Sequence, residues 1–156
     1  MTKEIERKFL VSGDFKKHSI KSHKIVQGYL STVPERTVRV RIRDHQGFIT
    51  IKGISNASGT TRFEWEKEIP VKEAENLLLL CEPTIIEKTR HIVPANDNLY
   101  FEVDEFLGEN KGLLIAEIEL PKENSEFVKP SWLGEEVTGQ LKYYNAMLAK
   151  KPFREW

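Results

Sequence analysis

The chain has 156 residues, which suits one domain, and 39% of them are hydrophobic, enough for a buried core. Charged residues make up 31%, yet the formal net charge is +0, so composition does not indicate a global attraction to nucleic acid or to membranes. The single cysteine, Cys81, excludes an internal disulfide bond, and no run approaches the ~20 apolar residues of a membrane-spanning helix.

Short runs in which apolar and polar residues alternate with a period of two dominate the chain, and they predict antiparallel β structure. The turn at residues 44–47 joins two such runs and is typical of a hairpin. Helical patterns are few and short. In chain order, we expect strands at 2–11, 24–32, 37–43, 48–52, 61–71, 85–93, 99–107 and 113–121, and helical segments at 14–18, 73–81, 123–129 and 139–150, the last capped by Thr138.

Most of the strands have one apolar face and one face that is almost wholly charged, because residues i and i+2 of a strand share a face. Arg39, Arg41 and Arg43, for example, alternate with Val38 and Val40. The ordinary interpretation is a sheet whose charged face lies in water. Against it, the charged faces contain little Ser, Thr, Asn or Gln, and eight strands are enough to close a barrel, which would turn one face inward.

An inward charged face would bury two complementary sets of side chains, which is costly unless they pair or bind something. A triphosphate with divalent cations would satisfy both sets, because Arg and Lys bind phosphate oxygens and clustered carboxylates are ligands for Mg2+ or Mn2+. The acidic set is Glu4, Glu6, Glu64, Glu66, Glu102, Asp104, Glu117 and Glu119, and the basic set is Lys8, Arg39, Arg41, Arg43, Lys52, Arg62, Lys88 and Arg90.

The run Glu4-Ile5-Glu6-Arg7-Lys8 resembles the E-x-E-x-K signature of the CYTH family, the triphosphate tunnel metalloenzymes. The resemblance covers essentially the whole chain and is nearest to small bacterial inorganic triphosphatases. It continues through Gln27-Gly28-Tyr29-Leu30, Arg39-Val40-Arg41-Ile42-Arg43, Thr50-Ile51-Lys52, Arg62-Phe63-Glu64-Trp65-Glu66, Glu87-Lys88-Thr89-Arg90, Phe101-Glu102-Val103-Asp104, Ala116-Glu117-Ile118-Glu119 and Gly134-Glu135-Glu136-Val137-Thr138. It implies a single domain over residues 1–156 that is mainly β (α+β): a closed eight-stranded antiparallel β-barrel with a few flanking helices.

The resemblance also implies roles for the two charged sets. The implied metal ligands are Glu4, Glu6, Glu117 and Glu119, with Glu64, Glu66 and Asp104 as additional candidates. The implied substrate-binding residues are Lys8, Arg39, Arg41, Arg43, Lys52, Arg62, Lys88 and Arg90, among which Lys8, Lys52 and Lys88 are the catalytic candidates. The chain departs from the pattern at one place: close relatives have Tyr-Lys-Asn near the final helix, and this chain has Tyr143-Tyr144-Asn145.

The function expected from these residues is hydrolysis of the terminal phosphoanhydride of a triphosphate, most of all inorganic triphosphate, with Mg2+ or Mn2+ as cofactor. The alternatives are a class IV adenylyl cyclase that converts ATP to cyclic AMP and pyrophosphate, a non-catalytic polyphosphate- or nucleotide-binding module, and an interaction barrel with an exposed charged sheet. Both carboxylate pairs are present, which favours an enzyme, and no motif declares an adenine pocket.

The expected partner is a small-molecule triphosphate rather than nucleic acid or a membrane. Outward apolar positions need a cover, so a homodimer through the outer sheet face is a further expectation. The charged residues near the N-terminus do not form a signal peptide, which gives a cytoplasmic location as the default.

Overall fold

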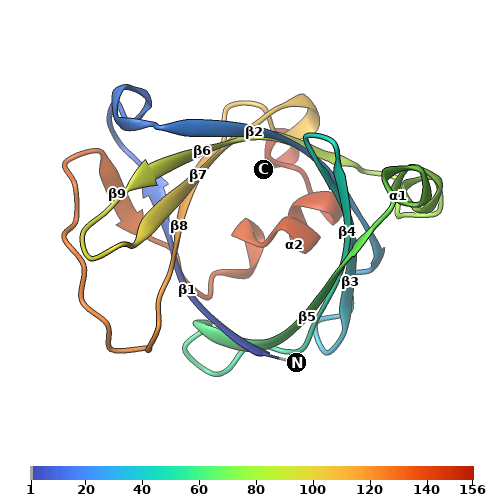
Figure 1. Ribbon diagram of the computed structural model, residues 1–156, viewed down its shortest axis with the longest axis horizontal. Helices are drawn as coiled ribbons and strands as arrows, with labels where there is room; N and C mark the ends of the chain where they lie inside the picture. Colours follow the sequence, from blue (N-terminus) through green and yellow to red (C-terminus); the bar gives the residue numbers. More distant parts are fainter. Residues whose placement is uncertain (1) are drawn as a thin grey trace.

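The computed structural model describes residues 2–156, and β-strands dominate it (Figure 1). The sheet order is β5-β4-β3-β2-β6-β7-β8-β1, and the sheet closes into a ring because β5 also pairs with β1. The predicted closed eight-stranded antiparallel barrel is confirmed, with a ninth strand beside it. The strands are β1 (Thr2–Val11), β2 (Lys21–Ser31), β3 (Thr37–Arg43), β4 (Gln46–Lys52), β5 (Thr61–Ile69), β6 (Ile86–Pro94), β7 (Tyr100–Phe106), β8 (Leu114–Glu119) and β9 (Leu133–Glu136).

Strand β1 closes the ring and changes neighbours along its length. Its residues 2–5 pair with β5, its residues 6–10 pair with β8, and β9 pairs with its last part. Figure 1 shows β9 outside the ring of the other eight strands. The first strand of the chain is therefore held by segments from its middle and from its C-terminal part.

Loops cover the outer apolar face of β1, β7 and β8. Phe9, Phe101 and Ile118 on these strands are buried together with Phe15 and Trp132, which lie in the segments after β1 and before β9. The rings of Phe101 and Trp132 meet edge to face at a centroid distance of 5.1 Å. Because a strand alternates its faces, burying this face outside the barrel turns the charged face inward.

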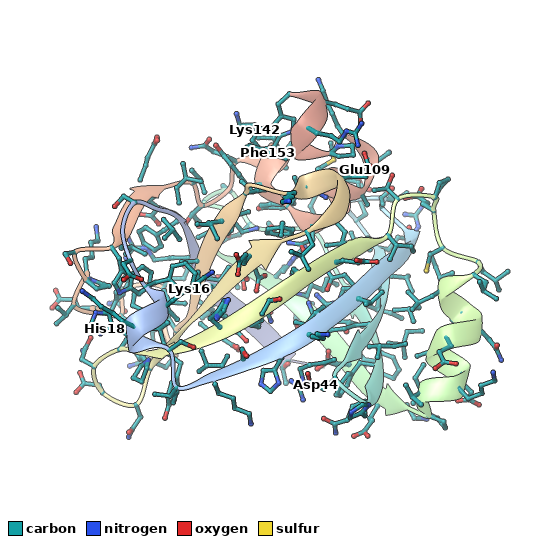
Figure 2. The ribbon with its side chains drawn as sticks, turned by 90° about the horizontal axis from the view of Figure 1, so that it is seen from above. Lys16, His18, Asp44, Glu109, Lys142 and Phe153 are labelled. Carbon is teal, nitrogen blue, oxygen red and sulfur yellow. The ribbon has the colours of Figure 1, made fainter. Side chains whose placement is uncertain are left out.

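The C-terminal segment closes one end of the barrel. Helix α2 (Asn145–Lys150) lies within the outline of the ring in Figure 1 and at the top end of the barrel in Figure 2, near the labelled Lys142 and Phe153. Leu148 packs there with Ile115 and Phe106 of the inner faces of β8 and β7. The short 3-10 helices of the described chain are η1 (Lys16–His18), η2 (Gly108–Asn110), η3 (Leu141–Tyr143) and η4 (Phe153–Glu155).

Helix α1 (Val71–Leu78) lies outside the barrel beside β4 and β3 (Figure 1). We expected a helix at 73–81, so the helix begins and ends earlier than the sequence predicted. It begins earlier because Pro70 precedes it, and proline suits a helix start, where its missing N–H needs no partner. It ends earlier because the chain turns back to the barrel, where the N–H of Glu82 donates to the carbonyl of Tyr29.

The helix expected at 123–129 was wrong, because this segment is irregular. The carboxylate of Glu123 accepts hydrogen bonds from Asn56, Thr60 and Thr61, and the N–H of Val128 donates to the side chain of Asn96. These polar groups bond to other loops instead of to a helical turn, and a helix this short is marginal alone.

The final helix expected at 139–150 is broken into η3 and α2. The break lies at Tyr144, whose ψ of 136° is extended, and the carbonyl of Tyr143 accepts a hydrogen bond from Lys8 Nζ at 3.2 Å. Thr138 does not cap a helix: its hydroxyl accepts from the backbone N–H of Lys8 and donates to Glu136. Contacts with the barrel interior thus override the helical pattern.

No helix among residues 2–156 has the length and apolar character needed to cross a membrane. On the outside of the barrel, Ile51 of β4 and Trp65 of β5 are cross-strand partners, and with Phe63 they form an exposed apolar patch. The expected homodimer stays a prediction.

Replacing Gly59 with alanine should destabilise the fold. Gly59 has a φ of 78°, and a Cβ there would collide with the backbone of Gly139. Gly108 is a matched control, because its φ of 59° carries similar strain while nothing lies within 4 Å of an added Cβ. We expect Gly108→Ala to cost about 1–2 kcal/mol and Gly59→Ala to cost about 1–3 kcal/mol more, measured by denaturant unfolding. Equal losses would contradict the proposed backbone collision.

Candidate functional site

A charged cavity of about 560 Å³ lies inside the barrel. In ring order, β4, β3, β2 and β6 form one half of the wall, and β7, β8, β1 and β5 form the other half. The first half contributes Arg39, Arg41, Arg43, Lys52, Lys88 and Arg90, and the second contributes Glu4, Glu6, Glu64, Glu66, Glu102, Glu117 and Glu119. A basic wall therefore faces an acidic wall, with Lys8 of β1 and Arg62 of β5 as two cations on the acidic side.

The basic wall holds guanidinium groups that carboxylates only partly neutralise. Arg41 donates from Nε to Gln27 Oε1 at 2.8 Å, so this partner is neutral. Burial, together with Arg39 and Arg90, lowers the pKa of Arg41 to about 9, which still leaves it charged at pH 7. Arg39 Nε is buried without a hydrogen-bond partner among the described residues. Unpaired donors on a buried cation are what an incoming anion would satisfy.

Asp104 forms ion pairs with two cations of this wall, Lys88 and Arg90, and does not itself line the cavity. It is fully buried, its two carboxylate oxygens accept from Arg90 at 2.7 and 2.9 Å, and Lys88 Nζ lies 2.8 Å from one of them. Although burial opposes ionisation, Arg90 and Lys88 lower the pKa of the Asp104 carboxyl. Arg90 also donates to Glu102 at 3.2 Å, so Glu102 balances the charge of a neighbouring arginine.

Lys88 is a second cation whose pKa its surroundings lower strongly. Burial, with Arg90 and Arg41 nearby, lowers its pKa to about 7 even though Asp104 acts in the opposite direction. Its Nζ also donates to Asn145 Oδ1 at 2.8 Å, which links β6 to the start of α2. The pKa of Lys88 is therefore close to neutral pH. Its partner Asn145 belongs to the segment that closes the barrel.

On the acidic wall, Glu4 is engaged by cations. Lys52 Nζ lies 2.8 Å from Glu4 and 3.3 Å from Glu64, and Arg62 Nε lies 3.8 Å from Glu4. Burial opposes the charge, but Lys52, a hydrogen bond from Glu64 and Arg62 lower the pKa of Glu4 to about 2. Burial and Glu4 together raise the pKa of Glu64. Lys52 thus pairs with two carboxylates, Glu4 and Glu64, that could instead be ligands of a metal ion.

Three further carboxyl groups face one another across β1 and β8. Glu6 and Glu119 are register partners, and Glu117 accepts a hydrogen bond from Glu6. Burial, Glu117 and Glu4 raise the pKa of Glu6 well above its usual range, whereas Lys8 and Arg90 hold the pKa of Glu117 well below its range despite burial. Burial and nearby Glu4 raise the pKa of Glu119. Carboxyl groups that share a proton are a donor set from which a divalent cation can displace that proton.

The cavity collects every residue implied by the family resemblance except Asp104, which lies behind its lining. Within residues 2–156, no three acidic, His or Cys side chains form a ready-made metal cluster, since Lys52 and Lys8 lie among the carboxylates. Sequence reasoning did not identify two amides as functional residues: Asn145, which lines the cavity, and Gln27, which accepts a hydrogen bond from Arg41. The resemblance contained both, but their neutral side chains gave no charge pattern to follow.

Tyr144 stands where the family resemblance implies a lysine, and it packs against two cations. Its ring centroid lies 4.6 Å from Lys8 Nζ and 5.6 Å from Arg62 Cζ, and its hydroxyl lies 3.4 Å from Ser55 Oγ. Cation–π contacts of this kind contribute about 0.5–2 kcal/mol. The tyrosine does not supply a charge, but its ring contacts two cations, Lys8 of β1 and Arg62 of β5.

With inorganic triphosphate, the substrate expected from the sequence, Tyr144→Leu should lower kcat/KM about 3- to 30-fold, because Lys8 and Arg62 lose the ring that holds them. Tyr144→Phe keeps the ring and loses only the weak contact with Ser55, so it should stay within about threefold of the wild type. Initial rates of phosphate release measure both variants. Equal activity of Tyr144→Leu and Tyr144→Phe would contradict a role for the ring in holding Lys8 and Arg62.

Comparison with known proteins agrees with this architecture. The chain matches the model of the CYTH domain over residues 2–152. It is 49% identical over 157 aligned positions to an inorganic triphosphatase of Acetivibrio thermocellus, covering 100% of this chain and 99% of the relative. It is 37% identical over 150 positions to an inorganic triphosphatase of Nitrosomonas europaea, covering 94% of this chain and 96% of the relative.

The crystal structure of the inorganic triphosphatase NE1496 has the same fold, with a TM-score of 0.68 and 34% identity over 96% of this chain and 95% of that chain. The match therefore extends from the closed barrel to the segment that covers its end. The family model, the relatives and the charged interior of the barrel lead to one conclusion: this chain belongs to the CYTH domain family.

Proposed function

We propose that this chain hydrolyses the terminal phosphoanhydride bond of inorganic triphosphate. The observation that carries the proposal is the opposition of a basic wall and an acidic wall inside one enclosed cavity. A linear chain of phosphates bound along the basic wall would present its remaining oxygens to the acidic wall. Carboxylates there would repel these oxygens unless a divalent cation lay between them.

The chemistry of the carboxyl groups fits such a cation. Glu4, Glu6, Glu117 and Glu119 are the proposed ligands, with Glu64 and Glu66 within the same lining. Asp104 has a different proposed role, because its oxygens already accept from Arg90 and Lys88. A bound Mg2+ or Mn2+ supplies charge neutralisation at the triphosphate oxygens and an activated water.

The cations of the cavity bind and orient the substrate. Arg39, Arg41 and Arg90 would bind the phosphate oxygens, and Arg39 would satisfy its unpartnered Nε in doing so. Lys52 would exchange its bond to Glu4 for a phosphate oxygen, which frees Glu4 for the cation. Water attacks the terminal phosphorus, a P–O bond forms as the anhydride P–O bond breaks, and orthophosphate and pyrophosphate leave.

The test is phosphate release from inorganic triphosphate, ATP and thiamine triphosphate, each with Mg2+, Mn2+ or EDTA. We expect rapid release from inorganic triphosphate with a divalent cation, and none with EDTA. The relatives do not favour the adenylyl cyclase alternative, and cyclic AMP with pyrophosphate from ATP would be its signature. Binding of triphosphate without any product would instead indicate a binding module and overturn the proposal.

A further inference from the structure

Two amide side chains, one buried and one half-buried, connect the basic wall of the cavity to the C-terminal segment. Gln27 of β2 is 0% exposed. Its Oε1 accepts from Arg41 Nε at 2.8 Å, and its Nε2 donates to Asn145 Oδ1 at 2.9 Å. Asn145 Oδ1 also accepts from Lys88 Nζ at 2.8 Å. The chain of contacts runs from Arg41 through Gln27 and Asn145 to Lys88.

The orientation of both amides follows from their partners. Arginine and lysine side chains only donate hydrogen bonds, so the oxygen of Gln27 must face Arg41 and the oxygen of Asn145 must face Lys88. The remaining NH2 group of Gln27 then meets the same oxygen of Asn145. Each cation is thus held by the negative end of an amide dipole.

Strand β2 lies in the middle of the basic half of the ring, yet its residues near the cavity are uncharged. Gln27 is the register partner of Arg41 on the neighbouring strand. A glutamate of the same size would reach the same guanidinium and form an ion pair with it. Arg90 and Lys88, by contrast, already have such a partner in Asp104.

We propose that Gln27, supported by Asn145, is a positioning residue of the triphosphate site that orients Arg41 without neutralising it. A neutral acceptor fixes the direction of Arg41 and leaves its full charge for the substrate. A carboxylate would fix the direction equally well and would compete with the phosphates for the same charge. The inference rests on the proposed function for the identity of the anion.

The decisive variant, Gln27→Glu, differs from the wild type in charge but hardly in shape. Gln27→Glu turns the amide into a carboxylate, and Gln27→Met removes the acceptor without adding charge. Gln46→Glu is the matched control, because Gln46 Oε1 accepts from Arg43 at 3.3 Å in an exposed hydrogen bond at the end of β4. Asn145→Asp makes the same change beside Lys88 and serves if Gln27→Glu does not fold.

Three quantities are measured for each protein: the dissociation constant of tripolyphosphate in EDTA by calorimetry, KM and kcat with Mg2+, and the unfolding midpoint without ligand. For Gln27→Glu we expect about 10- to 100-fold weaker binding and a KM raised to a similar extent, because a charged hydrogen-bonding group is neutralised. We expect kcat to change less than about threefold, and the unfolding midpoint to stay at or above that of Gln27→Met. Gln46→Glu should change binding less than about threefold, since its hydrogen bond is exposed.

If Gln27 had only a structural role, its variants would lose stability, and the added charge of Gln27→Glu would have no effect on tripolyphosphate binding. Unchanged binding by Gln27→Glu, or an equal loss in Gln27→Met, would therefore overturn the inference. A wild type that binds tripolyphosphate but does not hydrolyse it would overturn the proposed function alone, because the binding comparison would still decide the role of Gln27. A wild type that neither binds tripolyphosphate in EDTA nor hydrolyses it with Mg2+ would overturn both.

Discussion

Glu6→Gln should abolish turnover of inorganic triphosphate while leaving the protein at least as stable as the wild type without metal. Glu6 faces Glu119 and shares a hydrogen bond with Glu117. Within residues 2–156, no ion pair joins Glu6 to a cation, in contrast to Glu4 and Lys52. A glutamine has the shape and hydrogen-bonding groups of a protonated glutamate, so it removes repulsion among the carboxyl groups.

The same change removes a charged oxygen ligand from the proposed cation site, and we expect kcat/KM to fall at least about 100-fold. Phosphate release and thermal unfolding in EDTA measure the two effects. Glu136→Gln is a control outside the cavity, where Glu136 accepts two hydrogen bonds from Arg7 at 2.6 and 2.8 Å. That variant should lose stability and keep most of its activity. A Glu6→Gln protein that retains normal turnover would remove Glu6 from the proposed ligands.

The second large effect concerns Lys88, whose pKa is lowered to about 7. At pH 8 the empty site therefore holds Lys88 largely neutral, and a bound polyanion favours the ammonium form. Tripolyphosphate binding should then take up a proton at this side chain. We expect Lys88→Met to bind about 100-fold more weakly and to lose this proton uptake, because the charge-assisted contact disappears.

Calorimetry at pH 8 in two buffers with different ionisation enthalpies gives the number of protons taken up on binding. Lys142→Met is the control, because Lys142 is exposed and lies outside the cavity lining. Stability provides an independent check. The folded pKa lies below the ordinary value of 10.5, so between about pH 7 and 10.5 the unfolded chain holds the extra proton, and this residue's contribution to stability rises with pH. Equal proton uptake by wild type and Lys88→Met would contradict this account.

While the family resemblance implied the closed barrel, alternation along the strands predicted the β structure and placed the charged side chains on one face. It succeeded because a period of two is a property of each strand alone, and Arg39 with Arg41 shows it without any knowledge of their neighbours. It did not reveal that the two kinds of charge lie on opposite halves of the ring. That arrangement depends on strand order, which brings β1 beside β5 and β8.

The site residues that sequence reasoning left undefined are those whose role comes from a partner. Asp104 has the alternation of a lining residue, but Arg90 and Lys88 hold it behind the cavity. Gln27 and Asn145 are separated by 118 positions and meet only when the C-terminal segment covers the barrel. Tyr144 breaks the final helix for a similar reason, since the preceding carbonyl bonds to Lys8. Local pattern cannot encode such contacts.

The pairing of β1 has a consequence for the order in which the protein is made. Its backbone bonds to Thr138, 130 positions later, and its middle pairs with β8. A nascent chain leaving the ribosome therefore carries Glu4, Glu6 and Lys8 on a strand whose partners have not yet been synthesised. Such non-local closure makes folding slow and leaves an unpaired edge exposed in the meantime. Strand β1 is therefore secured long after it has been made, and the charged cavity closes only once the chain has been synthesised as far as Thr138.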